Sequence, residues 1–315
     1  MKKVSKAFSR LGVACCVLTL LACEEHRLLV LEDVPENRVT VKIHWEGVPE
    51  QDISKIGMRL NLFGLNGLDF GMRDMLGDVE TYEMPIDRIY RALCYDYYGS
   101  ENIYFRNENN PDLIEAYSAQ MNRASYDAVA PIRDGKLEST VAEPGAFYVA
   151  RVDSFQVSPQ SGDTLYFYPK NVLKTYTFTI TNVEDAQNIG DTRGALTGMS
   201  GSYFLSTGAL ATTASTILFY AQKNGQTNTI EGSFRTFGRV ADALNDFTIE
   251  ILVGDIMMSV PWDVKQLMIE AENNGTYHFT MAANIVIPQP PAPGPGEGGF
   301  KPDVDGWGET VDVPM

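Results

Sequence analysis

The chain has 315 residues and a formal net charge of −16, with 44% of its residues hydrophobic and 21% charged. These proportions are ordinary for a globular protein, and the length suffices for two domains of about 100–200 residues each. The acidic balance, with no basic patch in the sequence, argues against nucleic acid as a partner, because binding to a phosphate backbone depends on clustered lysine and arginine.

The first 23 residues have the layout of a secretory leader. Four basic side chains within the first ten residues precede an apolar run over 11–22, which is shorter than the roughly 20 apolar residues needed to span a bilayer. The run ends at positions 20–23 in Leu-Leu-Ala-Cys, which resembles the lipobox of bacterial lipoproteins. The resemblance implies that 1–22 is a signal peptide cut after Ala22, that a lipid is attached to the sulfur of Cys23, and that residues 23–37 are a polar tether. The alternative is an ordinary signal peptide cut nearby, with Cys23 left as a free thiol.

Residues 38–165 are predicted to form an N-terminal β-sandwich. Apolar and polar side chains alternate over 39–45 and again over 56–63, which is typical of strands with one buried face. Further strands are expected at 79–86, 89–98, 102–106 and 147–157, whereas 113–121 is ambiguous and could be a short helix. Short strands separated by Gly, Pro, Asn and Asp favour a sandwich.

A domain boundary is expected between Pro159 and Asn171, and residues 166–287 are predicted to form a C-terminal β-sandwich. Aromatic residues and isoleucine alternate with threonine over 176–181, and further strands are expected at 216–221, 229–234, 246–252 and 277–287. The best helix candidate is 260–273, because Pro261 lies near its start and Gly275 follows its end.

The end of the sequence combines a linker with one more strand. Residues 288–299 are rich in proline and glycine, which predicts a linker. In the predicted strand 300–315, apolar side chains share one face: Trp307, Val311, Val313 and Met315. A hydrophobic strand on a flexible linker has to bury that face, either on a neighbouring molecule or in cis on its own second domain.

These features together resemble the fimbrillin-like subunits and the anchor or accessory lipoproteins of Bacteroides-type fimbriae, also called type V pili. The resemblance rests on the leader ending at Cys23, the strand-rich two-part body, the stretch 171–178 and the ending 300–307. It implies an all-β fold of two transthyretin-like β-sandwich domains in tandem with a few short helices. It also implies strand exchange, in which the terminal strand of one subunit fills a groove in the next. Shaft subunits of the family expose that groove after cleavage behind an arginine near the N-terminus, for which Arg27 and Arg38 are the candidates here.

No combination of residues indicates catalysis, a metal or a cofactor. The three histidines are scattered, and Cys94 remains without a partner once the leader cysteines are removed and Cys23 is modified. Residues 198–202, Gly-Met-Ser-Gly-Ser, approach a nucleophile elbow but lack its last glycine, so a loop is expected there. Residues 303–306, Asp-Val-Asp-Gly, begin like a calcium loop whose later ligands are missing.

The first hypothesis is therefore a non-enzymatic fimbrial anchor or accessory subunit at the cell surface, held in the outer membrane by its lipid. Its partners would be other fimbrial subunits, joined by strand exchange. The alternative is a surface glycan-binding lipoprotein that stacks sugars on exposed aromatic residues, although buried strand residues are the commoner explanation for such a set. The residues concerned are Tyr95, Tyr97, Tyr98, Tyr104 and Phe105.

Overall fold

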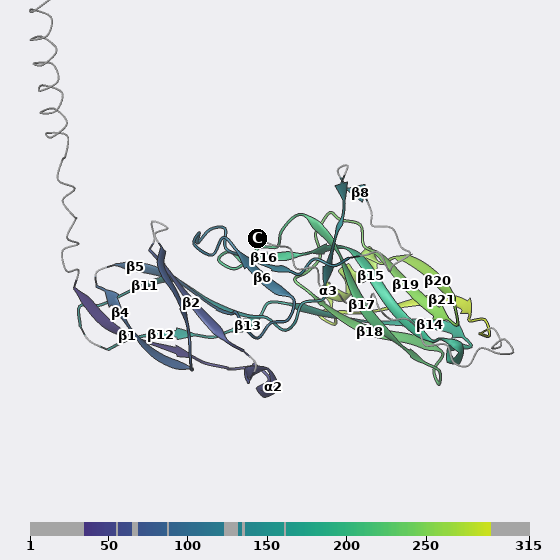
Figure 1. Cartoon of the computed structure of the whole chain (residues 1–315), viewed down its shortest axis with the longest axis horizontal. Helices are drawn as coiled ribbons and strands as arrows, with labels where there is room; N and C mark the ends of the chain where they lie inside the picture. Colours follow the sequence, from purple (N-terminus) through teal and green to yellow (C-terminus); the bar gives the residue numbers. More distant parts are fainter. Residues whose placement is uncertain are drawn as a thin grey trace, which may run out of the picture.

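The computed structural model describes residues 35–290, apart from 55, 65–68, 87, 123–131, 134–135 and 161. Figure 1 shows two strand-rich bodies arranged along the long axis of the molecule. Within the described ranges, the helices are two short α-helices and one 3-10 turn: α2 (Glu50–Ile53), α3 (Lys265–Asn273) and η1 (Ala186–Asn188). The all-β fold class predicted from the sequence is confirmed.

The first body packs a three-stranded sheet, in the order β12-β1-β4, against a five-stranded sheet, in the order β13-β11-β5-β2-β3. Alternate residues of the strands point inward, and Val41, Leu60, Cys94 and Phe167 lie in the shared core. The strands are β1 (Glu36–Ile43), β2 (Met58–Gly64), β3 (Asp69–Asp74), β4 (Val79–Pro85), β5 (Ile89–Asp96), β11 (Tyr148–Gln156), β12 (Asp163–Phe167) and β13 (Lys170–Asn171).

The second body is an eight-stranded sheet, in the order β20-β19-β15-β17-β18-β14-β21, that wraps around one core, with β10 also paired to β17. Phenylalanine rings from several strands meet in this core, among them Phe219 and Phe234 with ring centroids 4.8 Å apart. The two ends of the sheet are bridged, because the indole Nε1 of Trp262 donates a hydrogen bond to the carbonyl oxygen of Ala282 at 3.3 Å. The strands are β10 (Ser139–Ala142), β14 (Lys174–Glu184), β15 (Asp191–Ser200), β17 (Ala214–Asn224), β18 (Thr229–Thr236), β19 (Asp246–Val253), β20 (Ile256–Asp263) and β21 (His278–Val286).

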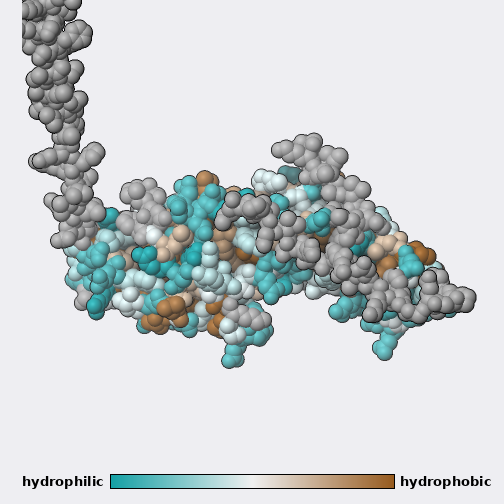
Figure 2. Space-filling view, viewed as in Figure 1, coloured by the Kyte–Doolittle hydropathy of each residue, from teal (hydrophilic) through white to brown (hydrophobic). Residues whose placement is uncertain are grey.

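The two bodies share a junction built from both halves of the sequence. A three-stranded sheet there combines β6 (Ile103–Arg106) and β7 (Glu115–Ser118) with β16 (Ser202–Phe204). An apolar cluster joins Tyr95 and Phe147 of the first half to Leu205 and Phe237 of the second. A small hairpin, β8 (Ile132–Arg133) with β9 (Lys136–Leu137), precedes β10. The surface facing the viewer in Figure 2 is mostly hydrophilic, with scattered hydrophobic patches, as expected when apolar side chains pack inside.

Two local predictions need correction. Residues 260–263 belong to β20, and the helix begins only at Lys265. β20 is the last strand in the sheet order and pairs with β19 alone within the sheet. Pro261 is tolerated there because the N–H that proline lacks is not needed to pair with a second strand. Of the loop expected at 198–202, residues 198–200 are the end of β15 and Ser202 begins β16, so only Gly201 lies between strands. The ambiguous stretch 113–121 contains the strand β7.

The end of β15 escaped prediction because Gly198 forms a bulge. The register of β15 with β17 shifts between Leu196 and Met199, and Gly198 has a φ of +78°. Glycine, which readily adopts positive φ, suggests a turn when it is seen in a sequence. Here it lies inside a strand that is paired with β17 on one side and β19 on the other. Tertiary pairing therefore overrides the local signal.

Candidate functional site

The strand that follows the predicted tether is built into the middle of a sheet. β1 pairs in parallel with β12, from Val39 opposite Asp163 to Ile43 opposite Phe167. On its other side it pairs antiparallel with β4, from Glu36 opposite Pro85 to Lys42 opposite Val79. β1 therefore has hydrogen-bonded neighbours along both edges.

Side chains fix β1 as firmly as its backbone does. Val39 and Val41 are fully buried, and Ile43 is 7% exposed, while the residues between them point outward. At the start of the strand, the side-chain amide of Asn37 donates hydrogen bonds to the carbonyl oxygens of Ser158 (3.0 Å) and Gln160 (2.5 Å). The strand is therefore part of the first core and occupies its place in the sheet.

Arg38, one of the two candidate cleavage positions, lies within β1. Its side chain is 78% exposed, and its Nε is 4.0 Å from Oε1 of Glu83 on β4, which is a weak surface ion pair. Its backbone is opposite Glu83 in the β1–β4 ladder. A cut after Arg38 would leave Val39, Val41 and Ile43 in the core, so it would not empty the groove that β1 fills.

The other predicted site residues lie outside the described residues. This holds for the lipid site Cys23, for Arg27, for residues 291–299 of the linker, and for the calcium-like stretch 303–306. It also holds for the residues of the predicted terminal strand: Trp307, Val311, Val313 and Met315.

The aromatic residues considered as a sugar platform are largely packed together. Tyr95 is fully buried, and Phe105 belongs to the same apolar cluster. The ring of Tyr97 is covered on both sides, because the Arg59 guanidinium lies 3.2 Å from its centroid and Phe105 stacks against it with centroids 5.1 Å apart. Tyr98 and Tyr104 are exposed. Tyr95, Tyr97 and Phe105 therefore pack into the junction, and only Tyr98 and Tyr104 of the set are exposed.

A charged network supports this aromatic cluster from the first body. Arg59 donates hydrogen bonds to Asp74 at 2.6 and 3.1 Å, and the Tyr98 hydroxyl donates to the same carboxylate at 2.7 Å. The bonds from Arg59 hold the pKa of Asp74 below its ordinary value, because they favour the charged carboxylate. These groups are engaged with one another and serve the packing of the junction.

The histidine, serine and cysteine side chains that could carry chemistry lie far apart in the fold and have structural surroundings. His44 stacks on Tyr168 in the first body with centroids 5.1 Å apart, whereas His278 belongs to β21 in the second. Ser200 donates its hydroxyl hydrogen bond to the carbonyl oxygen of Ser202 at 2.8 Å. Burial raises the pKa of the Cys94 thiol. Across the described ranges, no group of three or more His, Cys, Asp and Glu side chains is placed to hold a metal ion.

The helices of the described part of the chain are short. None of its helices has both the length and the apolar character that crossing a bilayer requires.

Comparisons with known proteins connect this architecture to fimbriae. The sequence is 24% identical over 337 aligned positions to a Bacteroides ovatus protein named "Putative fimbrium anchoring subunit Fim4B", covering 95% of this chain and 96% of that one. A Bacteroides ovatus protein described as a "putative adhesin" has a similar fold, with a TM-score of 0.62 and 19% identity over 84% of this chain and 96% of that one. The fimbrial anchor protein Mfa2 from Porphyromonas gingivalis gives a TM-score of 0.50 and 12% identity over 80% of this chain and 91% of that one.

The similarity to fimbrial anchor proteins expected from the sequence is thus confirmed. A family model also matches residues 22–220, which span the last residue of the predicted leader, the whole first body and the start of the second. This match covers more than half of the sequence, and the chain belongs to the family described as a domain of unknown function, DUF5119.

Proposed function

We propose that the protein is a fimbrial anchor or accessory subunit, lipidated at Cys23, tethered in the outer membrane and exposed at the cell surface. The similarity to the Bacteroides ovatus fimbrium anchoring subunit, which extends over 95% of this chain, supports the role. Residues 24–35 can span about 40 Å when extended, which is enough to hold the first body clear of the membrane surface.

The observation that carries the proposal is the position of β1. A subunit that keeps its own strand between β12 and β4 has no gap between these two strands for a strand from a neighbour. Such a subunit can still donate its terminal strand, so it fits one end of a fibre. The end nearest the membrane is the one consistent with a lipid at Cys23.

The donated segment is residues 300–315. Burying Trp307, Val311, Val313 and Met315 in a partner, at about 1.5–3 kcal/mol each, gives on the order of 6–12 kcal/mol before the cost of ordering. Residues 291–315 extend to about 80 Å, so the strand can reach well beyond its own second body. Main-chain hydrogen bonds in the partner's groove would supply the affinity, and alternate side chains would set the register.

Lipidation is tested by metabolic labelling with a fatty acid. We expect the label on the wild-type chain and its complete loss in Cys23→Ala. A label that persists in Cys23→Ala, or that is absent from the wild type, would contradict the lipid assignment.

Strand donation is tested with two substitutions on opposite faces of the tail. We expect Val311→Asp to abolish co-purification of fimbrial subunits, because it places a charge in the buried face. The matched control Thr310→Asp, on the other face of the same strand, should leave co-purification intact. Equal effects of both substitutions, or no effect of Val311→Asp, would refute donation. A large drop in the thermal midpoint of isolated Val311→Asp would instead indicate that the tail is packed in cis.

A further inference from the structure

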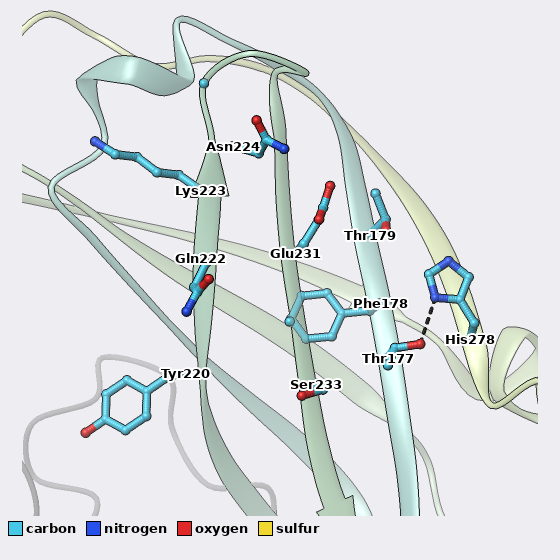
Figure 3. A pocket seen from close by; sticks show the side chains of 12 residues that line it. Thr177, Phe178, Thr179, Tyr220, Gln222, Lys223, Asn224, Glu231, Ser233 and His278 are labelled. Atoms are coloured by element: carbon cyan, nitrogen blue, oxygen red, sulfur yellow. Dashed lines mark hydrogen bonds between the residues drawn. The ribbon is translucent and has the colours of Figure 1, made fainter.

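A groove crosses the outer face of the second body, away from its apolar core. It has a volume of about 680 Å³ and runs over strands β17, β18, β14 and β21. Figure 3 shows the side chains that line it, projecting from these four strands. None of the predicted site residues belongs to this groove.

The floor of the groove is a set of polar side chains produced by strand alternation. On β14, Tyr176, Phe178 and Ile180 are buried in the core, so Thr177 and Thr179 point outward. The neighbouring strands contribute further hydrogen-bonding groups to the same face: Gln222 from β17, with Glu231 and Ser233 from β18. Hydroxyl and amide groups both donate and accept hydrogen bonds, as sugar hydroxyls do.

An aromatic side chain and a fixed imidazole border this polar floor. Tyr220 on β17 is 62% exposed and lines the groove. A tyrosine side chain combines an apolar ring with a polar hydroxyl. At the opposite side His278 is held by a hydrogen bond between its Nδ1 and the Oγ1 of Thr177, at 2.9 Å. A ring next to several donors and acceptors is the combination that recognises a pyranose, which has both a C–H face and equatorial hydroxyls.

The charges in the groove favour a neutral ligand. Lys223 points away, and its ammonium donates hydrogen bonds to the carbonyl oxygens of Gln187, at 3.1 Å, and Ile189. The Glu231 carboxylate accepts a hydrogen bond from the Thr229 hydroxyl at 2.8 Å. Lys223 is the lysine among the described lining residues, and its ammonium is engaged outside the groove. With Glu231 in the lining and a chain charge of −16, an anionic polymer would be repelled.

A peptide strand does not fit the same surface. β14, β17 and β18 are interior strands, and each is hydrogen-bonded to neighbours on both sides. Their backbone groups are used within the sheet, so the groove cannot bind a peptide by strand addition. Only side chains are presented, which again suits a ligand recognised through its hydroxyl groups.

We propose that this groove binds a neutral oligosaccharide, with Tyr220 stacking on a sugar ring and Gln222, Thr179 and Ser233 hydrogen-bonding to its hydroxyls. The site differs from the feature that carries the anchor role, because its described lining lies on the second body and not on β1.

The proposal is tested by affinity electrophoresis of the full mature chain in detergent. The native gels contain mannan, arabinoxylan, mixed-linkage β-glucan or polygalacturonate. We expect at least one of the three neutral polysaccharides to retard the wild type. Tyr220→Ala should weaken that affinity at least tenfold, and Gln222→Ala at least threefold. The matched control Tyr104→Ala, which removes another exposed tyrosine outside the groove, should bind as the wild type does.

The proposal is overturned if no neutral polysaccharide retards the wild type, if polygalacturonate alone does, or if both groove variants bind normally. Far-UV circular dichroism checks that each variant is folded. If Tyr220→Ala misfolds, the binding of Gln222→Ala, which changes an exposed side chain, decides whether the proposal stands. Fimbria attachment should stay at the wild-type level in both variants. Its loss in Val311→Asp with glycan binding intact would separate the two functions.

Discussion

Replacing Val41 with alanine should loosen the strand that connects the tether to the first body. Val41 is fully buried between the two sheets. Losing two methyl groups removes about 1.6 kcal/mol of transfer free energy. The cavity left behind adds about 1 kcal/mol, because the surrounding sheets relax only partly. We therefore expect the opening free energy of β1 to fall by about 2–3 kcal/mol.

Hydrogen exchange measured by mass spectrometry reads this quantity directly for peptides that cover β1. A loss of 2–3 kcal/mol corresponds to exchange about 30 to 150 times faster in β1 and its partners β4 and β12. The control is Lys42→Ala, one residue further along and on the outer face, which should change exchange less than about threefold. Equal acceleration in both variants, or none in Val41→Ala, would refute the assignment of β1 to the first core.

Three further predictions follow from buried or strained positions. In the folded mature chain, residues 23–315 with Cys23→Ser, Cys94 should not react with a thiol reagent, because it is fully buried and its thiol pKa is raised. Full reactivity should appear in denaturant, and fast labelling of the folded chain would contradict its placement. Gly198→Ala should lower the free energy of unfolding, measured by urea titration, by about 2–4 kcal/mol. The reason is that Gly198 has a φ of +78° and that a Cβ at this position would clash with the carbonyl oxygen of Leu244. An unchanged unfolding midpoint in urea would argue against the bulge. Asp74→Asn should reduce the loss of unfolding free energy at acid pH. Because the pKa of Asp74 is lowered in the folded state, its carboxylate stabilises the fold above the ordinary pKa of 3.8, and this stabilisation is lost as the pH falls through the folded pKa. An identical dependence of stability on pH in the variant and the wild type would refute this prediction.

Local patterns were enough to predict most strands but not how they pair. The alternation over 39–45 and 176–181 was visible because one face of each strand is buried. The parallel pairing of β1 with β12, and of β10 with β17, joins segments far apart in the sequence. Such pairings depend on the whole fold, and short-range periodicity carries no information about them.

The candidate sites show the same limit. The aromatic residues around Tyr97 could be recognised as a cluster, but only the structure shows Arg59 and Phe105 covering both faces of the Tyr97 ring. The groove was missed because its side chains come from four strands that are spread from residue 177 to residue 278 of the sequence. The alternation around Thr177 was a usable signal, since it marks an outward polar face. It could not show which other strands extend that face.

The two-sided pairing of β1 would have a mechanical consequence under the proposed lipid tether. Tension between the membrane and the fibre would enter the first body at Glu36 and act along the strand. Because β4 and β12 hold it on opposite edges, the strand cannot peel away from one side and has to slide past both neighbours, breaking many hydrogen bonds together. Such a joint resists sudden pulling far better than its equilibrium stability alone would indicate.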